Sequence, residues 1–262
     1  RRTPVLFPWL EGFLPGLPRN VRGLVAKDIR IFIRDPMQWS QALIFFGLLA
    51  VYFGNIRSFR YNFLDETWRN AIAFLNVFSV SAVMCSLSSR FIYPQLSLEG
   101  HGFWAIGLSP LTMRRVLATK FGLSSIVMVI ICSSLMFLST AMLEASIPVR
   151  IVAISVAAAV SLASCALSTG LGAIFLDLEQ RNPAAIVSGF GGTLNLVLGL
   201  AFILSVTIPF GVVFELQAMK RLAVAQAHQG MIICTLWTLV VTAIATIVPL
   251  LLGARSLSRR EF

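Results

Sequence analysis

The sequence predicts an all-α membrane protein with six transmembrane helices, preceded by an amphipathic helix at the membrane interface. Hydrophobic residues make up 57% and charged residues 12% of its 262 residues, and the mean hydropathy is +0.85. Soluble domains are far less apolar. Six long apolar stretches contain no Asp, Glu, Lys, Arg or His, which is the pattern of membrane-crossing helices.

The first 20 residues are expected to form a linker or tether. Pro4, Pro8, Pro15 and Pro18 occur there, and this density of proline prevents a continuous helix. The linker is the first of three predicted regions, which are 1–20, an interfacial connecting helix over 21–36, and a transmembrane domain over 37–262.

Residues 21–36 show helical amphipathicity. Leu24, Val25, Ile29, Phe32 and Ile33 recur at helical spacing, while other faces carry basic side chains at Lys27, Arg30 and Arg34. Such a helix is expected to lie flat among cytoplasmic lipid headgroups. The alternative left open is a buried amphipathic helix of a soluble domain.

The predicted spans cover residues 40–53, 70–89, 121–143, 151–175, 184–214 and 231–254. About 20 apolar residues cross the hydrocarbon core as a helix. The first span is short and is expected to extend back through Met37. The fifth is too long for one upright helix, and Pro209 and its glycines predict a kink, a break or an extension beyond the bilayer.

The basic residues predict the orientation. Most of the 21 Lys and Arg residues fall in segments that share a side with the amino terminus, so the positive-inside rule favours both termini in the cytoplasm. We therefore expect a multi-pass protein of the plasma (inner) membrane in contact with lipids. The net charge of +10 is explained by headgroups and topology, so no nucleic-acid partner is expected.

The connector over residues 94–120 is longer than a turn requires. We expect a short helix from Leu98 to Leu108, a stop at Ser109-Pro110, and a second helix whose Arg114, Arg115 and Lys120 meet headgroups. The first helix has an apolar face that fits a groove on a partner protein. From the residues alone, simple anchoring of the loop at the interface is an equal alternative.

Two segments of the chain carry a resemblance to a known family. Glu99, Gly102, Leu108, Ser109-Pro110, Arg114-Arg115, Leu117 and Lys120 resemble the cytoplasmic coupling helix and loop of ABC-2 type permeases. The stretch 26–41 resembles ABC exporter permeases within that superfamily. The architecture of that family covers the chain from about residue 21.

This resemblance implies the membrane-spanning permease subunit of an ATP-driven ABC exporter. A separate ABC ATPase (nucleotide-binding) subunit would hydrolyse ATP, and the permease would work as a dimer with a second copy or a homologous half. The implied ATPase contacts are Glu99, His101, Phe103, Trp104, Leu108, Ser109, Pro110, Arg114 and Arg115. Further contacts are implied on the connecting helix, at Lys27, Arg30, Phe32 and Arg34.

No cofactor is expected on this chain. The sequence contains no GxxxxGK[S/T], and the glycine-rich run 189–192 lacks the following lysine, so ATP and Mg are assigned to the partner and the chain is not expected to be an enzyme. The cysteines have no CxxC spacing and no neighbouring His, which excludes a metal site of the usual kind.

The spans contain no ionisable group, so a translocation path would need weakly polar and aromatic linings. The candidates are Asn76, Phe78, Ser79, Phe190, Thr193 and Asn195. Close helix packing explains the small polar residues equally well.

Two further hypotheses stay open. One is a membrane scaffold or assembly subunit that holds a non-ATPase partner through the 94–120 loop. The other, a membrane-embedded enzyme, is disfavoured because carboxylates and His or Cys ligands are not clustered in the sequence.

Overall fold

The computed structural model describes residues 18–34, 66–102, 112–180 and 182–259, with residues 36, 39–40, 43–44, 46–47, 50–51 and 54. Within this part of the chain the fold is all-helical and has no strand. The long helices are α2 (Arg19–Arg34), α4 (Glu66–Phe91), α6 (Met113–Met142), α7 (Ile147–Ile174), α9 (Phe190–Ala218) and α10 (Val224–Ser258), with a short α8 (Pro183–Ser188) before α9. Two 3-10 helices, η2 (Tyr93–Gln95) and η3 (Ser97–Gly102), follow α4.

Five segments of the described chain are long and apolar enough to cross a membrane: Ala71–Gly100, Met113–Met142, Ile147–Ile174, Phe190–Ala218 and Ala225–Ser258. They correspond to the second to sixth predicted spans and confirm the all-helical class. Six spans are not confirmed. Several residues of the first predicted span, 40–53, lie outside the described part, although those that are described there are helical.

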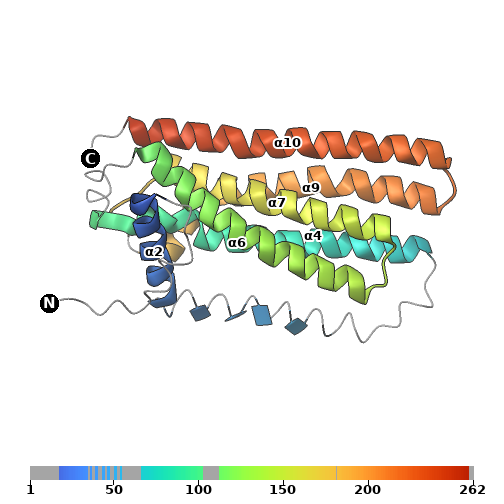
Figure 1. Cartoon of the computed structure of the whole chain (residues 1–262), viewed down its shortest axis with the longest axis horizontal. Helices are drawn as coiled ribbons and strands as arrows, with labels where there is room; N and C mark the ends of the chain where they lie inside the picture. The colour runs from blue at the N-terminus through green and yellow to red at the C-terminus, as the bar shows by residue number, and fades with distance from the viewer. Residues whose placement is uncertain are drawn as a thin grey trace.

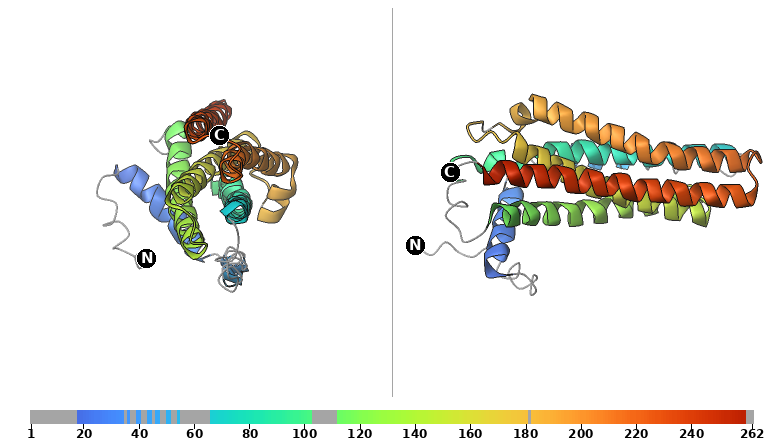
Figure 2. Two further views of the ribbon diagram at one scale, coloured as in Figure 1. Left: turned by 90° about the vertical axis from the view of Figure 1, so that its right-hand side faces the viewer. Right: turned by 90° about the horizontal axis from the view of Figure 1, so that it is seen from above.

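Helix α7 is the central element of the bundle. Figures 1 and 2 show α4, α6, α9 and α10 running alongside it. Its side chains at Ala153, Ala157 and Val160 are fully buried, and small residues allow neighbouring helices to approach closely. By contrast, α6 and α10 expose apolar side chains such as Ile130 and Leu236, as expected of surfaces that face lipid.

The contact between α7 and α10 depends on glycine. A Cβ atom added at Gly253 would lie 2.8 Å from the carbonyl oxygen of Gly170, and one added at Gly170 would overlap the backbone of Pro249. The two backbones therefore pack directly against each other, which side chains at these positions would prevent.

The fifth predicted span is broken, as its glycines indicated. Helix α8 ends at Ser188, Gly189 has extended φ and ψ angles of −68° and 170°, and α9 starts at the next residue. The side chain of Asn182 accepts a hydrogen bond of 3.0 Å from the backbone N–H of Ala184 and caps α8. Pro209 lies inside α9 without ending it.

Helix α2 lies across one end of the bundle (Figure 1), at the end where α6 begins and α10 ends. Its Leu24 is buried in a cluster with Leu117 of α6 and Leu257 of α10. The amphipathic pattern therefore forms a helix here, and its placement at a membrane interface stays a prediction.

The connector differs from its predicted form. In place of a helix from Leu98, the described residues form η3, which has a kink at Gly100, where φ is 52°. Residues 103–111 lie outside the described part of the chain. The second helix starts at Met113 and continues without a break as α6.

Candidate functional site

Four charged side chains meet where α2, η3 and α6 converge. The ammonium of Lys120 donates hydrogen bonds to Asp28 Oδ2 at 3.1 Å and to Glu99 Oε1 at 2.9 Å. Lys27 Nζ lies 2.6 Å from both carboxylate oxygens of Glu99 and 3.7 Å from Asp28 Oδ1. We call Lys27, Asp28, Glu99 and Lys120 the ion cluster.

The ion cluster is largely shielded from solvent. The side chain of Lys120 is 1% exposed, Asp28 6% and Glu99 10%, whereas Lys27 is 37% exposed. Two ammonium groups balance two carboxylates. Charges this buried are tolerated only when they are paired and hydrogen-bonded, so the ion cluster fixes α2 and η3 to the start of α6.

Local structure brings the members of the ion cluster together. Lys27 and Asp28 are neighbours on α2, so their side chains leave the helix in different directions. Lys27 therefore bonds to Glu99 of η3, while Asp28 bonds to Lys120 of α6. Glu99 precedes Gly100, whose positive φ is a conformation that glycine adopts without steric cost. The expectation that Lys120 meets headgroups is wrong, because its ammonium is buried in the ion cluster.

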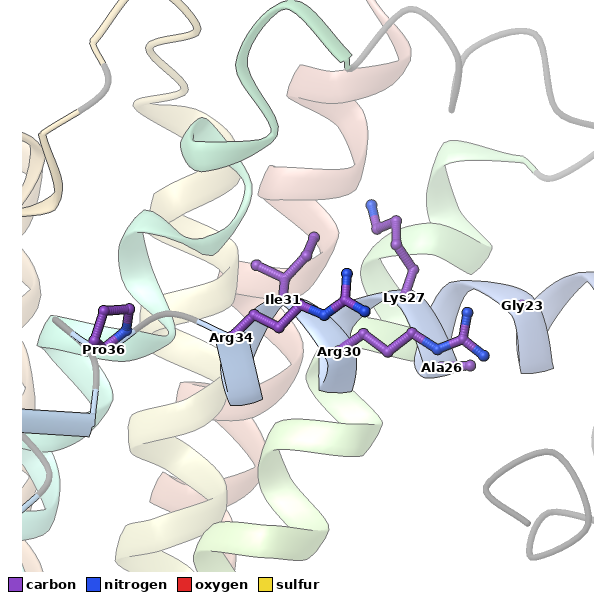
Figure 3. Close-up of a pocket in the computed structure, with 7 residues that line it drawn as sticks. All are labelled: Gly23, Ala26, Lys27, Arg30, Ile31, Arg34 and Pro36. Carbon is purple, nitrogen blue, oxygen red and sulfur yellow. The ribbon is translucent and has the colours of Figure 1, made fainter. Parts of the chain in front are cut away.

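A row of basic side chains lies along α2, and Lys27 belongs both to this row and to the ion cluster. Lys27, Arg30 and Arg34 recur at helical spacing and line an open pocket of about 660 Å³ together with Gly23, Ala26, Ile31 and Pro36. Figure 3 shows the guanidinium groups of Arg30 and Arg34 directed along the helix towards Gly23. Arginine and lysine side chains in this arrangement suit phosphate or carboxylate groups.

The predicted partner contacts are only partly described. Glu99 belongs to the ion cluster, and His101 falls in the last turn of η3. Arg114 and Arg115 are exposed on the first turn of α6. Phe103, Trp104, Leu108, Ser109 and Pro110 lie outside the described residues. Contact of any of these residues with a partner stays a prediction.

Phe32 is exposed near the carboxyl end of α2. Its ring centroid lies 6.3 Å from that of Phe91 in α4 and 5.8 Å from that of Trp39. The predicted connecting-helix residues therefore fall into two groups, a basic row and an aromatic contact with the bundle.

The predicted path residues occupy several environments. Asn76 is buried and donates a hydrogen bond to Ser139 of α6, whereas Asn195 donates to Ser168 Oγ of α7 at 2.9 Å. Ser168 Oγ also lies 2.9 Å from Ser88 Oγ of α4. These asparagines thus join helices at two different interfaces.

The remaining path candidates lie nearer the surface. Phe78 and Ser79 are half-buried in α4, and the Ser79 hydroxyl donates to Leu75 O of its own helix. Phe190 and Thr193 are exposed at the start of α9. The lining of a path by these six residues stays a prediction.

The described residues contain no group of three His, Cys, Asp or Glu side chains that could hold a metal ion. The four cysteines are buried free thiols. Sequence reasoning did not single out Asp28, the second carboxylate of the ion cluster. Asp28 could have been identified from the sequence because it is an acidic residue that stands alone among the basic residues of an amphipathic helix.

A family model described as "Putative ATP-binding cassette" matches residues 6–262 of the chain. No curated protein and no solved structure was found to match it. The matched region includes the whole described fold.

This match corrects several predictions. The resemblance to ABC-2 type permeases named a different family and rested on two short segments, whereas the model spans residues 6–262. The predictions of an exporter permease without an ATP site, of a non-enzyme, and of ATP and Mg bound only by a partner are contradicted as well, since the description names an ATP-binding cassette. The sequence still contains no GxxxxGK[S/T].

Proposed function

The chain belongs to this ATP-binding cassette family, and from that premise we propose that it is a multi-pass membrane component of an ABC transporter, acting through the end of the bundle that carries α2. The observation that carries the proposal is the joining of α2 and η3 to the α6 span by the buried ion cluster. A force applied to α2 or η3 is thereby transmitted to a long apolar helix.

The α2 end is proposed to face the cytoplasm of the plasma (inner) membrane. Basic residues are concentrated there on α2, at the start of α6 and at the end of α10, whereas the opposite end of the described bundle has Arg69 at the start of α4 and Arg150, Lys220 and Arg221 near its loops. The positive-inside rule supports this orientation. Both termini would then be cytoplasmic.

Orientation is tested by labelling with a membrane-impermeant maleimide. The native cysteines are buried, so Arg115→Cys and Arg221→Cys introduce reactive thiols at opposite ends. In intact cells we expect labelling at position 221 only, and in inverted vesicles at position 115 only. Labelling of position 115 from outside intact cells would reverse the proposed topology.

Partners are proposed to bind at two surfaces. Exposed Arg114 and Arg115, with Glu99 and the segment that includes Phe103 to Pro110, would contact another ABC component at the α2 end. The apolar outer faces of α6 and α10 would contact lipid or a second half of the transporter. Charge reversal tests the first surface.

Affinity purification from the native host measures that contact. Arg114→Glu with Arg115→Glu should lower the yield of co-purified ABC subunit, whereas the matched variant Lys220→Glu with Arg221→Glu, at the other end, should retain it. Equal recovery of the ABC subunit with both variants would show that the start of α6 does not contribute to this contact.

The family description favours a second candidate function, which is binding of ATP by this chain itself. Without a P-loop motif, the phosphates would need other cations. The basic row on α2 offers Arg30 and Arg34, together with Lys27, whose charge is shared with Glu99.

Photolabelling of the purified chain with azido-ATP and Mg²⁺ tests this candidate. Labelling that excess ATP abolishes, and that Arg30→Gln with Arg34→Gln reduces at least tenfold, would support it. If the purified chain is not labelled and does not hydrolyse ATP, ATP binding by this chain is excluded. The proposed membrane role is tested separately, by the topology and co-purification experiments.

A further inference from the structure

A cavity of about 380 Å³ lies on the inner side of α2, between that helix, α4, η2, η3 and α6. Its wall is mostly apolar and includes Phe32, Met84, Leu87, Met128 and Ile131. Its polar wall consists of Asp28, Glu99 and Lys120 from the ion cluster, with Gln95 and Ser124. The cavity is therefore amphiphilic.

The polar wall contains an unused hydrogen-bond acceptor. The side-chain oxygen of Gln95 is buried and accepts no hydrogen bond within the described chain. A buried carbonyl without a donor is unfavourable, and a ligand hydroxyl would supply that donor. The amide NH₂ of Gln95 can in turn donate to such a head group.

The balance of charge selects against an ionic head group. Lys27 and Lys120 already neutralise Asp28 and Glu99. An additional charge in this mostly apolar space would have no counter-ion and would be costly to desolvate.

Because water fills about 30 Å³ per molecule, and a methylene group is of similar size, the cavity has room for one chain of roughly ten to twelve carbons.

We propose that this cavity binds a neutral amphiphile with a single hydrocarbon chain and a hydroxyl-bearing head group. The head group donates to Gln95 beside the ion cluster, and the chain lies between Phe32 of α2, Met84 of α4 and Met128 of α6. The cavity wall does not include Lys27, Arg30 or Arg34 of the basic row, and the proposal does not depend on the proposed ABC function.

The test uses the full chain in phosphatidylcholine nanodiscs and a monoacylglycerol with a photoreactive diazirine on its chain. Mass spectrometry should locate cross-links on α4 near Met84 and on α6 near Met128. Unlabelled monoacylglycerol should compete at concentrations at least tenfold lower than the matching fatty acid or alkylamine.

Two variants probe the two parts of the cavity. Gln95→Leu should reduce labelling about tenfold, and Ser124→Trp, which fills the space, should abolish it. The matched control Ile130→Trp lies on the same helix at a lipid-facing position that is 61% exposed and should leave labelling unchanged. Gln95→Glu should shift the competition in favour of the alkylamine.

Three results would overturn the proposal. The first is labelling spread over lipid-facing positions such as Ile130, since that would be ordinary solvation by lipid. The second is labelling that survives both Gln95→Leu and Ser124→Trp. The third is stronger competition by the fatty acid or the alkylamine in the unmodified protein, which would refute the neutral head group. Retention of a monodisperse elution profile identifies the variants that remain folded.

Discussion

The ammonium of Lys120 lies 3.1 Å from Asp28 Oδ2 although the two residues are 92 positions apart in the sequence. This pair joins the crosswise helix α2 to α6, a helix that is long and apolar enough to cross a membrane. Glu99 bonds to the same ammonium at 2.9 Å, so a single buried cation holds two separate segments. The stability of this end of the bundle should therefore depend on Lys120.

Replacement of Lys120 by Met is expected to destabilise the protein by about 3 kcal/mol. That is the lower end of the range for breaking a buried ion pair, because Glu99 keeps Lys27 as a partner at 2.6 Å, whereas Asp28 keeps only the longer contact with Lys27 at 3.7 Å. Thermal unfolding in detergent measures the change. Arg221→Met, at an exposed position, should have little effect, and Asp28→Asn should recover part of the loss in the Lys120→Met background.

Replacement of Gly100 by Val is expected to weaken the attachment of η3. Gly100 has a φ of 52°, which costs a β-branched residue about 1–3 kcal/mol, and it directly follows Glu99. Limited proteolysis should cut the connector faster in this variant. Gly122→Val, where an added Cβ meets nothing within 4 Å, serves as the control, and equal cleavage of both variants would contradict the expectation.

Replacement of Gly170 by Val is expected to separate α7 from α10. The new side chain would collide with the backbone at Pro249, and overpacking of this kind costs about 1–3 kcal/mol or more. Its effect on the unfolding temperature should exceed that of Gly122→Val. An unchanged unfolding temperature would show that α10 does not pack on α7 at this point.

Replacement of Ser168 by Ala is expected to leave the buried Asn195 amide without its acceptor. Hydrogen bonds between membrane helices contribute about 0.6–2 kcal/mol, so the loss should be of that size. Ser79→Ala is the matched control, because the Ser79 hydroxyl donates to Leu75 O of its own helix. A double-mutant cycle with Asn195→Leu should show coupling between positions 168 and 195, and strictly additive effects would contradict the bond.

The all-helical class and five of the spans followed from the sequence because apolar runs of this length have few other stable forms in a membrane. The break near Gly189 was predictable for a similar local reason, since the run from residue 184 to 214 exceeds one bilayer crossing. These features depend on neighbouring residues in the chain.

The candidate site could be predicted only in part. The sequence identified Lys27, Glu99 and the basic spacing of α2 as notable, but it assigned Lys120 to headgroups and gave no role to Asp28. An ion pair across 92 residues depends on how α2 crosses the end of the bundle, and no local pattern encodes that crossing.

The family assignment shows the same limit. Short segments around Glu99 and residues 26–41 suggested one family, and the match over residues 6–262 identified another. Hydrophobicity, helical spacing and the absence of a GxxxxGK[S/T] motif were determined by the sequence itself. The tertiary structure alone decided which charges are buried together and where an amphiphilic cavity remains, because both depend on side chains brought together from α2, α4, η3 and α6.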